Sequence, residues 1–310
     1  MKQYLRRLFS FVVFFLPVVS STPIRAVNTY GLETELAFQC GLSCCWVNNN
    51  SYYIKKVYDM GFNAIRLPYS AEYINRGDFK FMDEIIQKTG DLNMSVILDY
   101  HRTWSGHQGN WYETNLHDFL QVWEKVLFRY YDRPHVRYVD LFNEFQDGHD
   151  RADFWNDIMT QSILYLENKF PLRWHYFVGG TNWSGSLQNI KVNVPPEVDV
   201  RVSYSIHKYQ WSVMGDYRAD YTLSFGGYSG EKLFVGEFGW IQSNPQQVEW
   251  ATMFLTYLKE HQISNTALWC LSYYSGDTQG ILQPNCLDVE HEKLNILKNF
   301  WSSNQTYLRK

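Results

Sequence analysis

Short apolar runs recur along the chain at nearly regular intervals, and this feature constrains the fold more than any other. Most of these runs are almost continuous in apolar residues, which is typical of β-strands that are buried on both faces. Seven runs are clear and an eighth precedes them. They cover residues 26–33, 62–67, 94–100, 136–143, 174–180, 200–207, 232–238 and 266–273.

Helical patterns lie between these runs. Residues 116–132 place apolar side chains on one stripe at helical spacing, and Thr114 or Asn115 can cap the start of this helix. The runs begin at intervals of roughly 30 to 40 residues, which is about one βα unit each. Eight such units predict an α/β fold, a (β/α)8 TIM barrel. An open doubly wound sheet is disfavoured because no glycine-rich nucleotide-binding motif follows the first strand.

The first 21 residues read as a secretory signal peptide. A basic stretch, "MKQYLRRL", precedes the apolar run "FSFVVFFLPVV", and small residues follow near Ser21. The apolar run is shorter than the roughly 20 residues that cross a bilayer, which disfavours an uncleaved membrane anchor. We therefore expect residues 1–21 to be removed and residues 22–310 to form one catalytic domain. The mature protein is expected to be extracellular, monomeric and free of the membrane.

The cysteine content fits an oxidising compartment. There are five cysteines, so one is left unpaired, and Cys270 in a strand-like run is the expected buried free thiol. The other four allow two disulfides in three connectivities, which the sequence leaves open: Cys40, Cys44, Cys45 and Cys286. A zinc site in the Cys40–Cys45 cluster is disfavoured because no histidine lies nearby to complete it.

Four N-x-S/T sequons occur, at Asn49, Asn93, Asn182 and Asn304. Each can accept an N-glycan only where it is exposed in a eukaryotic secretory route. We expect some of them, but not all, to be used.

The charge balance excludes some partners. A net charge of −4 gives no reason to expect binding to nucleic acid or to an anionic membrane. The 12 tryptophans are a high number that calls for a role beyond filling the core. No motif for a metal ion or a cofactor is present, so neither is expected.

Polar or aromatic residues end nearly every predicted strand. Because the carboxyl ends of the strands meet at one mouth of a barrel, these side chains are expected to share a site. Glu144 and Glu237 end the fourth and seventh strands, so two carboxylates should face each other there. Such a pair is what glycoside hydrolysis requires, since one must be protonated and the other ionised. The remaining candidates are Arg66, His101, Asn143, His207, Tyr209 and Trp269.

Several tryptophans follow strand ends in this pattern. Flat indole faces suit the C–H faces of pyranose rings, so four of them are candidates for sugar stacking. These are Trp104, Trp183, Trp211 and Trp240. The expected partner is therefore a polysaccharide or an oligosaccharide.

At these positions the sequence resembles glycoside hydrolase family 5, the cellulase family of retaining (β/α)8 enzymes. The resemblance covers most of the mature chain, and seven motifs occur in the family's order. They are "GLET" (31–34), "NAIRLPYS" (63–70), "LDYHR" (98–102), "FNEF" (142–145), "SIHKY" (205–209), "VGEFG" (235–239) and "LWCLSYYSGDTQGIL" (268–282). Phe145 stands where the family usually has proline. Tyr100 stands where close relatives often carry a basic residue, and this second difference predicts altered substrate contacts.

The resemblance implies that Glu144 is the acid/base and Glu237 the nucleophile. It also implies that Arg66, His101, Asn143, His207, Tyr209 and Trp269 bind the sugar or support the nucleophile. The sequence thus predicts a secreted retaining glycosidase, with endo-β-1,4-glucanase preferred because "SGDTQGIL" resembles the cellulase branch. The alternatives are action on β-mannan, β-1,3-glucan, xyloglucan or a glycolipid, or a barrel that binds glycans without cleaving them.

Overall fold

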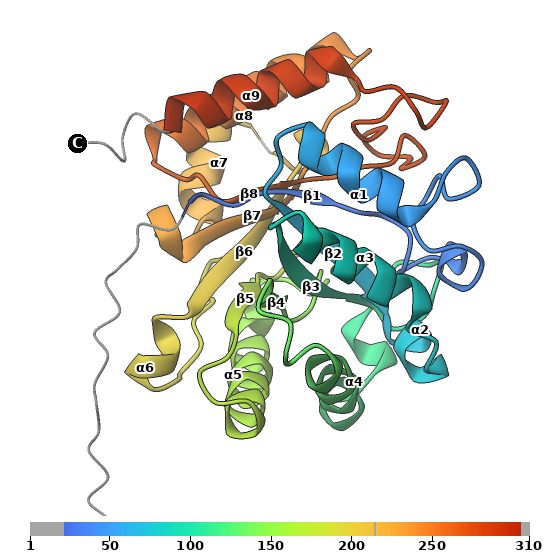
Figure 1. The fold of residues 1–310 in the computed structure, drawn as a ribbon. Coiled ribbons are helices and arrows are strands. Elements are labelled where there is room, and N and C mark those ends of the chain that lie inside the picture. Colours follow the sequence, from blue (N-terminus) through green and yellow to red (C-terminus); the bar gives the residue numbers. More distant parts are fainter. Residues whose placement is uncertain (1–21, 214, 305–310) are drawn as a thin grey trace, which may run out of the picture.

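The computed structural model describes residues 22–213 and 215–304, so the predicted signal peptide lies outside the described residues. Eight parallel strands pair in chain order, and β8 closes on β1 to form a barrel (Figure 1). This confirms the predicted (β/α)8 architecture. The strands are β1 Arg25–Asn28, β2 Ala64–Ser70, β3 Ser95–Arg102, β4 Val136–Asp140, β5 His175–Gly179, β6 Val202–Lys208, β7 Leu233–Phe238 and β8 Thr266–Leu268.

Helices surround the barrel on its outer side (Figure 1). Their starts follow ordinary capping rules: Asn115 caps α4 through a bond from the Asp118 amide, and Asn244 with Pro245 begins α8. The α-helices are α1 Asn50–Asp59, α2 Ala71–Arg76, α3 Lys80–Asp91, α4 Leu116–Arg129, α5 Ala152–Lys169, α6 Pro196–Asp199, α7 Tyr217–Ser224, α8 Pro245–Glu260 and α9 His291–Asn304.

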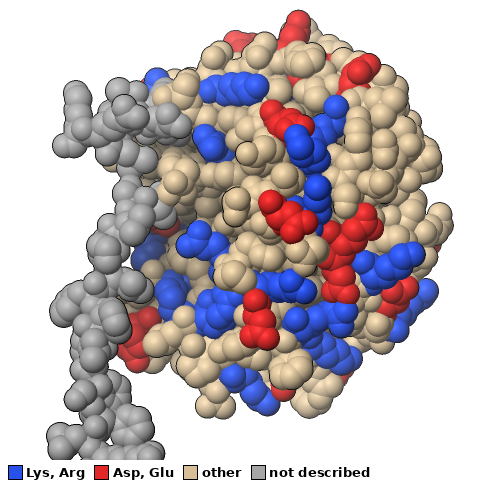
Figure 2. Space-filling view, in the orientation of Figure 1, with Lys and Arg blue, Asp and Glu red and all other residues tan. Residues whose placement is uncertain are grey.

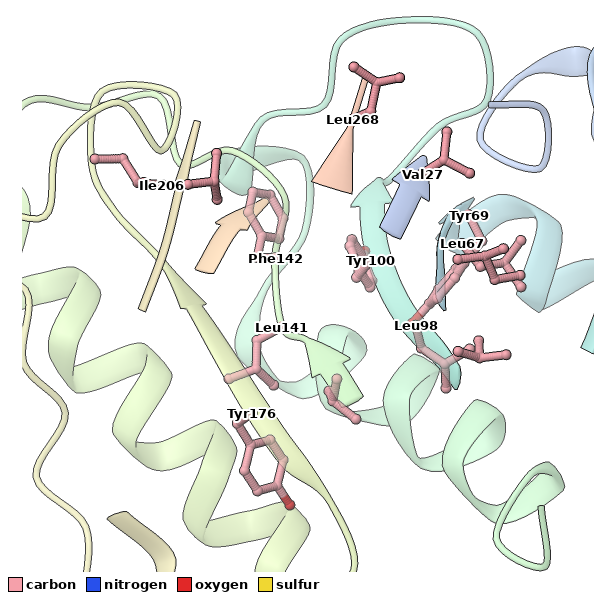
Figure 3. Close-up of a cluster of buried hydrophobic side chains, with 14 of the residues drawn as sticks. Val27, Leu67, Tyr69, Leu98, Tyr100, Leu141, Phe142, Tyr176, Ile206 and Leu268 are labelled. Atoms are coloured by element: carbon pink, nitrogen blue, oxygen red, sulfur yellow. The ribbon is translucent and has the colours of Figure 1, made fainter. Parts of the chain in front are cut away.

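The core has two shells because side chains alternate along each strand. One set points outward and packs under the helices, as Leu67, Leu98 and Ile206 do in Figure 3. The other set fills the inside of the barrel with an apolar layer. That inner layer contains Ile24, Ala26, Ala64, Ile97, Phe177, Phe234 and Ala267. Polar side chains lie two residues further along several of these strands, so the barrel becomes polar toward its carboxyl end.

Three strands end at least three residues before the position that the sequence predicts. β1 ends at Asn28 instead of residue 33, β4 at Asp140 instead of residue 143, and β8 at Leu268 instead of residue 273. The chain after Asp140 still bonds alternately to its neighbours, because the Leu141 amide donates to Phe177 and the Asn143 amide to Tyr100. Glu144 therefore remains directed to the mouth although it follows the strand.

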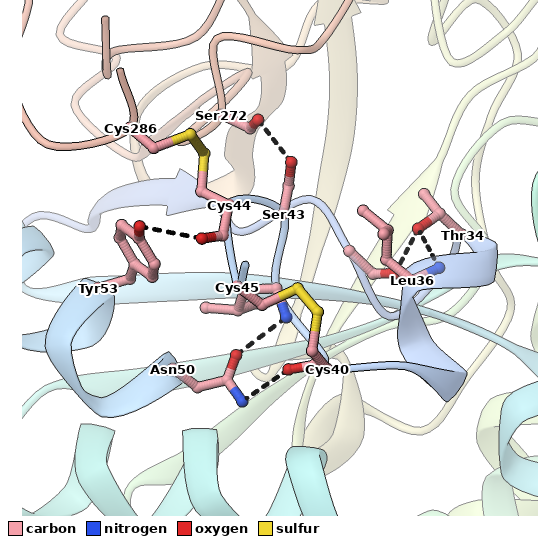
Figure 4. The surroundings of a disulfide bond; sticks show 12 residues. Thr34, Leu36, Cys40, Ser43, Cys44, Cys45, Asn50, Tyr53, Ser272 and Cys286 are labelled. Atoms are coloured by element: carbon pink, nitrogen blue, oxygen red, sulfur yellow. Dashed lines mark hydrogen bonds between the residues drawn. A yellow bond between two sulfur atoms is a disulfide. The ribbon is translucent and has the colours of Figure 1, made fainter. Parts of the chain in front are cut away.

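The structure selects one of the three disulfide connectivities (Figure 4). Cys40 pairs with Cys45, Cys44 pairs with Cys286, and Cys270 is buried and free as predicted. The Cys44–Cys286 bond joins the loop after β1 to the loop after β8, across a sequence separation of 242 residues. Beside it, the Ser43 and Ser272 hydroxyls are 2.7 Å apart.

The surface carries both signs of charge. Basic and acidic side chains mix across the face shown in Figure 2, and no large region of it has one sign. Asn49, Asn93 and Asn182 are exposed, so these sequons are accessible, while the side chain of Asn304 lies outside the description. None of the helices within residues 22–304 that the structure describes has the length and apolar character to cross a membrane.

Candidate active site

A cleft of about 790 Å³ opens at the carboxyl ends of the strands. Seven of the eight candidates from strand ends line it together: His101, Asn143, Glu144, His207, Tyr209, Glu237 and Trp269. The eighth, Arg66, lies beneath the cleft and is fully buried. The barrel thus brings together residues that are up to about 200 positions apart in the sequence, as expected for this fold.

Arg66 organises the floor of the cleft from β2. Its Nη1 lies 2.8 Å from Glu237 Oε1, its Nε donates to Asp140 Oδ2 at 2.8 Å, and its Nη2 donates to Asn143 Oδ1 at 2.8 Å. Asp99 Oδ2 is 3.1 Å from Nη1. Burial by itself would lower the pKa of Arg66, but the three carboxylates raise it above its usual range. The arginine therefore stays charged in a dry site.

Glu237 is buried near the end of β7 and receives two strong donors. Arg66 binds Oε1, and the Tyr209 hydroxyl donates to Oε2 at 2.8 Å. His207 stands beside it, since a shift in register between Ile206 and His207 pairs His207 with Glu237 across β6 and β7. Burial raises the pKa of Glu237 to about 7, while His207, Arg66 and Tyr209 act in the opposite direction. These donors favour the ionised carboxylate.

Glu144 has a different environment. His207 Nδ1 lies 2.9 Å from its Oε1, and Gln108 Nε2 donates to its Oε2 at 2.8 Å. Burial raises the pKa of Glu144 to about 7 and lowers that of His207 to about 4, so the imidazole is neutral. No cationic side chain bonds to Glu144 among the described residues. When the two carboxylates hold one proton between them, that proton therefore resides mainly on Glu144 and not on Glu237.

The two carboxylates are close enough to act on one bond. One oxygen of each, together with a ring nitrogen of His207, lies within 4.8 Å of the others. A metal ion could in principle use the same three atoms. However, His207 Nδ1 already lies 2.9 Å from Glu144 Oε1, and the two carboxylates accept hydrogen bonds from Arg66, Tyr209 and Gln108. These contacts are those of an acid–base pair.

Two aromatic rings, those of His101 and Trp269, line the cleft together. Their rings stack with centroids 5.3 Å apart and an interplanar angle of 8°. Asp99 fixes the His101 ring at Nδ1, 2.7 Å away, and the Trp269 indole donates to Ser275 at 2.9 Å. Each ring is thus held from behind and presents one edge or face to the cleft.

The four candidate stacking tryptophans divide into three groups. Trp183 and Trp211 are half-exposed and line the cleft, and Trp211 stacks on Tyr209 at 4.5 Å. Trp104 is exposed but does not line it. The prediction for Trp240 is wrong, because its ring is fully buried and its indole nitrogen bonds to Gln242. Its place in the sequence, shortly after a strand, does not indicate whether the side chain points into the cleft or into the core.

Both departures from the family pattern have a structural explanation. Phe145 is buried and stacks on Trp155, with centroids 4.3 Å apart and an angle of 3°. Packing therefore fixes the backbone after Glu144 where a proline ring would otherwise do so. Tyr100 faces outward under the helices, fully buried against Phe119 and Phe142. The predicted change in substrate contacts at Tyr100 is therefore wrong.

Sequence reasoning missed several members of the site. Asp140 and Asn28 bond to Arg66, and Gln108 bonds to Glu144. Asp140 could have been found, because it is a carboxylate inside an apolar run, like Glu237. Gln108 lies in a loop with no periodic pattern, so nothing in the sequence signals its partner.

A closed (β/α)8 barrel whose cleft holds two facing carboxylates is the architecture of a glycoside hydrolase. Comparison with known proteins agrees. The chain belongs to the cellulase family, glycosyl hydrolase family 5, whose family model matches residues 26–275. It is therefore an enzyme that acts on glycosidic bonds.

Two relatives of this chain are endoglucanases. The chain is 25% identical over 337 residues to the major extracellular endoglucanase of Xanthomonas campestris pv. campestris, covering 90% of this chain and 68% of the relative. It is 26% identical over 312 residues to an endoglucanase of Paenibacillus polymyxa, covering 83% of this chain and 77% of the relative.

Solved structures show the same fold. The catalytic domain of the Xanthomonas enzyme superposes with a TM-score of 0.78 at 24% identity, covering 90% of this chain and 95% of that chain. A complex of the Pyrococcus horikoshii endocellulase with cellotetraose superposes with a TM-score of 0.77 at 25% identity, covering 90% of this chain and 92% of that chain.

Proposed function

We propose that the protein is a secreted endo-β-1,4-glucanase that cleaves its substrate with retention of anomeric configuration. The observation that carries this proposal is the spacing of Glu144 and Glu237, whose oxygens approach within 4.8 Å. Retaining glycosidases hold their carboxyl groups about 5–5.5 Å apart, whereas inverting enzymes need about 6.5–9.5 Å to admit a water.

In this mechanism Glu237 attacks the anomeric carbon while Glu144 protonates the departing glycosidic oxygen. Arg66 and Tyr209 keep Glu237 ionised and aim its free lone pair. Water then enters on the leaving-group side, and Glu144 removes its proton as the glycosyl–Glu237 bond breaks. Asn143, held by Arg66, is placed to bond the hydroxyl next to the anomeric carbon.

Support for a β-1,4-glucan comes from the relatives. Both relatives named above are endoglucanases, and the Pyrococcus endocellulase binds cellotetraose. In this chain the half-exposed Trp183 and Trp211 line the cleft, where their faces can stack on glucosyl units. Secretion is supported by the predicted signal peptide, by the two disulfides and by the extracellular Xanthomonas relative.

The test is hydrolysis of a panel containing carboxymethylcellulose, β-mannan, laminarin and an aryl cellobioside, by wild type and Glu237→Gln. We expect cleavage of carboxymethylcellulose and the cellobioside, with loss of both in the variant. NMR of the first product should show the β-anomer. Preferential cleavage of mannan or laminarin would overturn the substrate assignment, and an initial α-anomer would overturn retention.

A further inference from the structure

Gln108 is the feature of the cleft that the mechanism above leaves without a role. It lies between β3 and α4, is exposed, and lines the cleft. Its Nε2 donates to Glu144 Oε2 at 2.8 Å, while His207 Nδ1 is 2.9 Å from Oε1. With the tautomer of His207 that carries its proton on Nδ1, both oxygens of an ionised Glu144 accept one hydrogen bond each in this geometry.

The loop that carries Gln108 is tied to the loop that carries Glu144. Gln146 Nε2 donates to the Gly109 carbonyl at 2.7 Å, and Asn110 Nδ2 donates back to Gln146 Oε1 at 2.9 Å. Further along, the Tyr112 hydroxyl donates to Asp147 at 2.5 Å. These bonds hold the backbone beside Gln108 close to the loop that carries Glu144, and the exposed Gln108 side chain bridges the two loops.

The two catalytic steps make opposite demands on this contact. In the same tautomer of the neutral His207, Nδ1–H donates to Oε1, so Glu144 as an acid carries its proton on Oε2. A proton on Oε2 faces the Gln108 amide N–H, so the amide must turn or withdraw before the leaving oxygen can approach. As a base in the second step, Glu144 must be ionised, which is the form that the Gln108 amide stabilises.

We propose that Gln108 is a positioning residue that sets the proton occupancy of Glu144 and yields Oε2 to the leaving group when substrate binds. This inference rests on the retaining mechanism proposed above. The other groups that face Glu144 come from β2, β3, β6 and β7 and from the residue that follows β6. They are Arg66, Asp99, Arg102, His207, Tyr209 and Glu237. All of these residues are present in wild type and in the Gln108 variants, so the comparison isolates the side chain at residue 108.

The experiment measures kcat/KM against pH for wild type, Gln108→Ala and Gln108→Glu on an aryl cellobioside. In Gln108→Ala, Glu144 loses the amide donor that stabilises its ionised form, so its acid form persists to higher pH. The pH at which kcat/KM falls on the alkaline side should therefore rise by roughly 0.5–1 pH unit. A carboxylate at residue 108 should move it further. Gln188→Ala is the matched control, because Gln188 lines the same cleft but does not bond to Glu144; its alkaline limb should stay in place.

A second measurement uses a dinitrophenyl cellobioside, for which breakdown of the glycosyl-enzyme limits kcat. In this step Glu144 acts as a base and must be ionised. Because Gln108→Ala raises the pKa of Glu144, the pH at which kcat falls on the acidic side should also rise in this variant. If wild type is active and both limbs of the pH profiles are unchanged in Gln108→Ala, with only KM altered, Gln108 is merely a substrate contact and the proposal is overturned. An inactive wild type would instead overturn the proposed function itself.

Discussion

Arg66 Nη1 lies 2.8 Å from Glu237 Oε1, and both side chains are buried at the floor of the cleft. The same guanidinium bonds Asp140 and Asn143, so one residue of β2 links the fourth and seventh strands. An apolar strand can therefore carry a carboxylate near its end, since the cost of burying Glu237 is offset by a charged and bonded partner.

Replacing Arg66 by methionine should be strongly destabilising, because three buried carboxylates would lose their cation. We expect the free energy of unfolding to fall by about 3–5 kcal/mol, as measured by urea denaturation. The control is Arg129→Met, which removes a half-exposed pair with Asp83 and should cost about 1 kcal/mol or less. Equal effects of the two substitutions would contradict the central role of Arg66.

Glu144→Gln should separate substrates by their leaving groups. Hydrolysis of carboxymethylcellulose should fall by about 10²–10⁴-fold, since the 4-oxygen of a glucan chain is a poor leaving group unless an acid protonates it. Formation of the glycosyl-enzyme from a dinitrophenyl cellobioside should be much less affected, because that leaving group departs without protonation. Glu237→Gln should abolish turnover of both. Stopped-flow release of dinitrophenolate measures this, and equal losses on both substrates would rule out Glu144 as the acid.

The same variant should change the pH dependence of stability. Burial raises the pKa of Glu144 from the ordinary 4.5 to about 7, so the folded state holds a proton that the unfolded chain has released. This contribution to stability is present below pH 4.5 and is lost as pH rises toward 7. The Tm of Glu144→Gln relative to wild type should therefore increase between pH 4.5 and 7 and level off above. A constant difference across that range would refute the shift.

Trp211→Ala should weaken binding of cello-oligosaccharides. Trp211 is 52% exposed in the cleft, whereas Trp104 is 51% exposed and lies outside it. Loss of one stacking face should raise KM for cellotetraose roughly tenfold, which is about 1.4 kcal/mol. Trp104→Ala is the matched control and should change KM less than twofold, which is about 0.4 kcal/mol. Comparable effects from both substitutions would place substrate beyond the cleft.

Removing the Cys44–Cys286 disulfide should cost more stability than removing Cys40–Cys45. The first closes a loop of 242 residues and the second spans only 5, and chain entropy favours the longer loop. Cys286→Ser should lower the free energy of unfolding by about 2–4 kcal/mol, and Cys45→Ser by less. Urea denaturation under non-reducing conditions would show the order, and a reversed order would contradict the entropic account.

The sequence by itself determined the βα repeat, the barrel and the pair formed by Glu144 and Glu237. These follow from local patterns, because continuous apolar runs specify strands buried on both faces and strand order fixes which ends meet. A buried carboxylate requires a partner, and the resemblance to glycoside hydrolase family 5 implied that Arg66 is one.

The tertiary structure decided what depends on side-chain direction and loop path. A register shift between β6 and β7 places His207 beside Glu237, and only the folded chain shows that Trp240 turns into the core. Gln108 reaches Glu144 because two loops are tied together, and Cys44 pairs with Cys286 because β8 closes on β1. Such contacts join residues whose separation in sequence carries no periodic signal, so packing alone selects them.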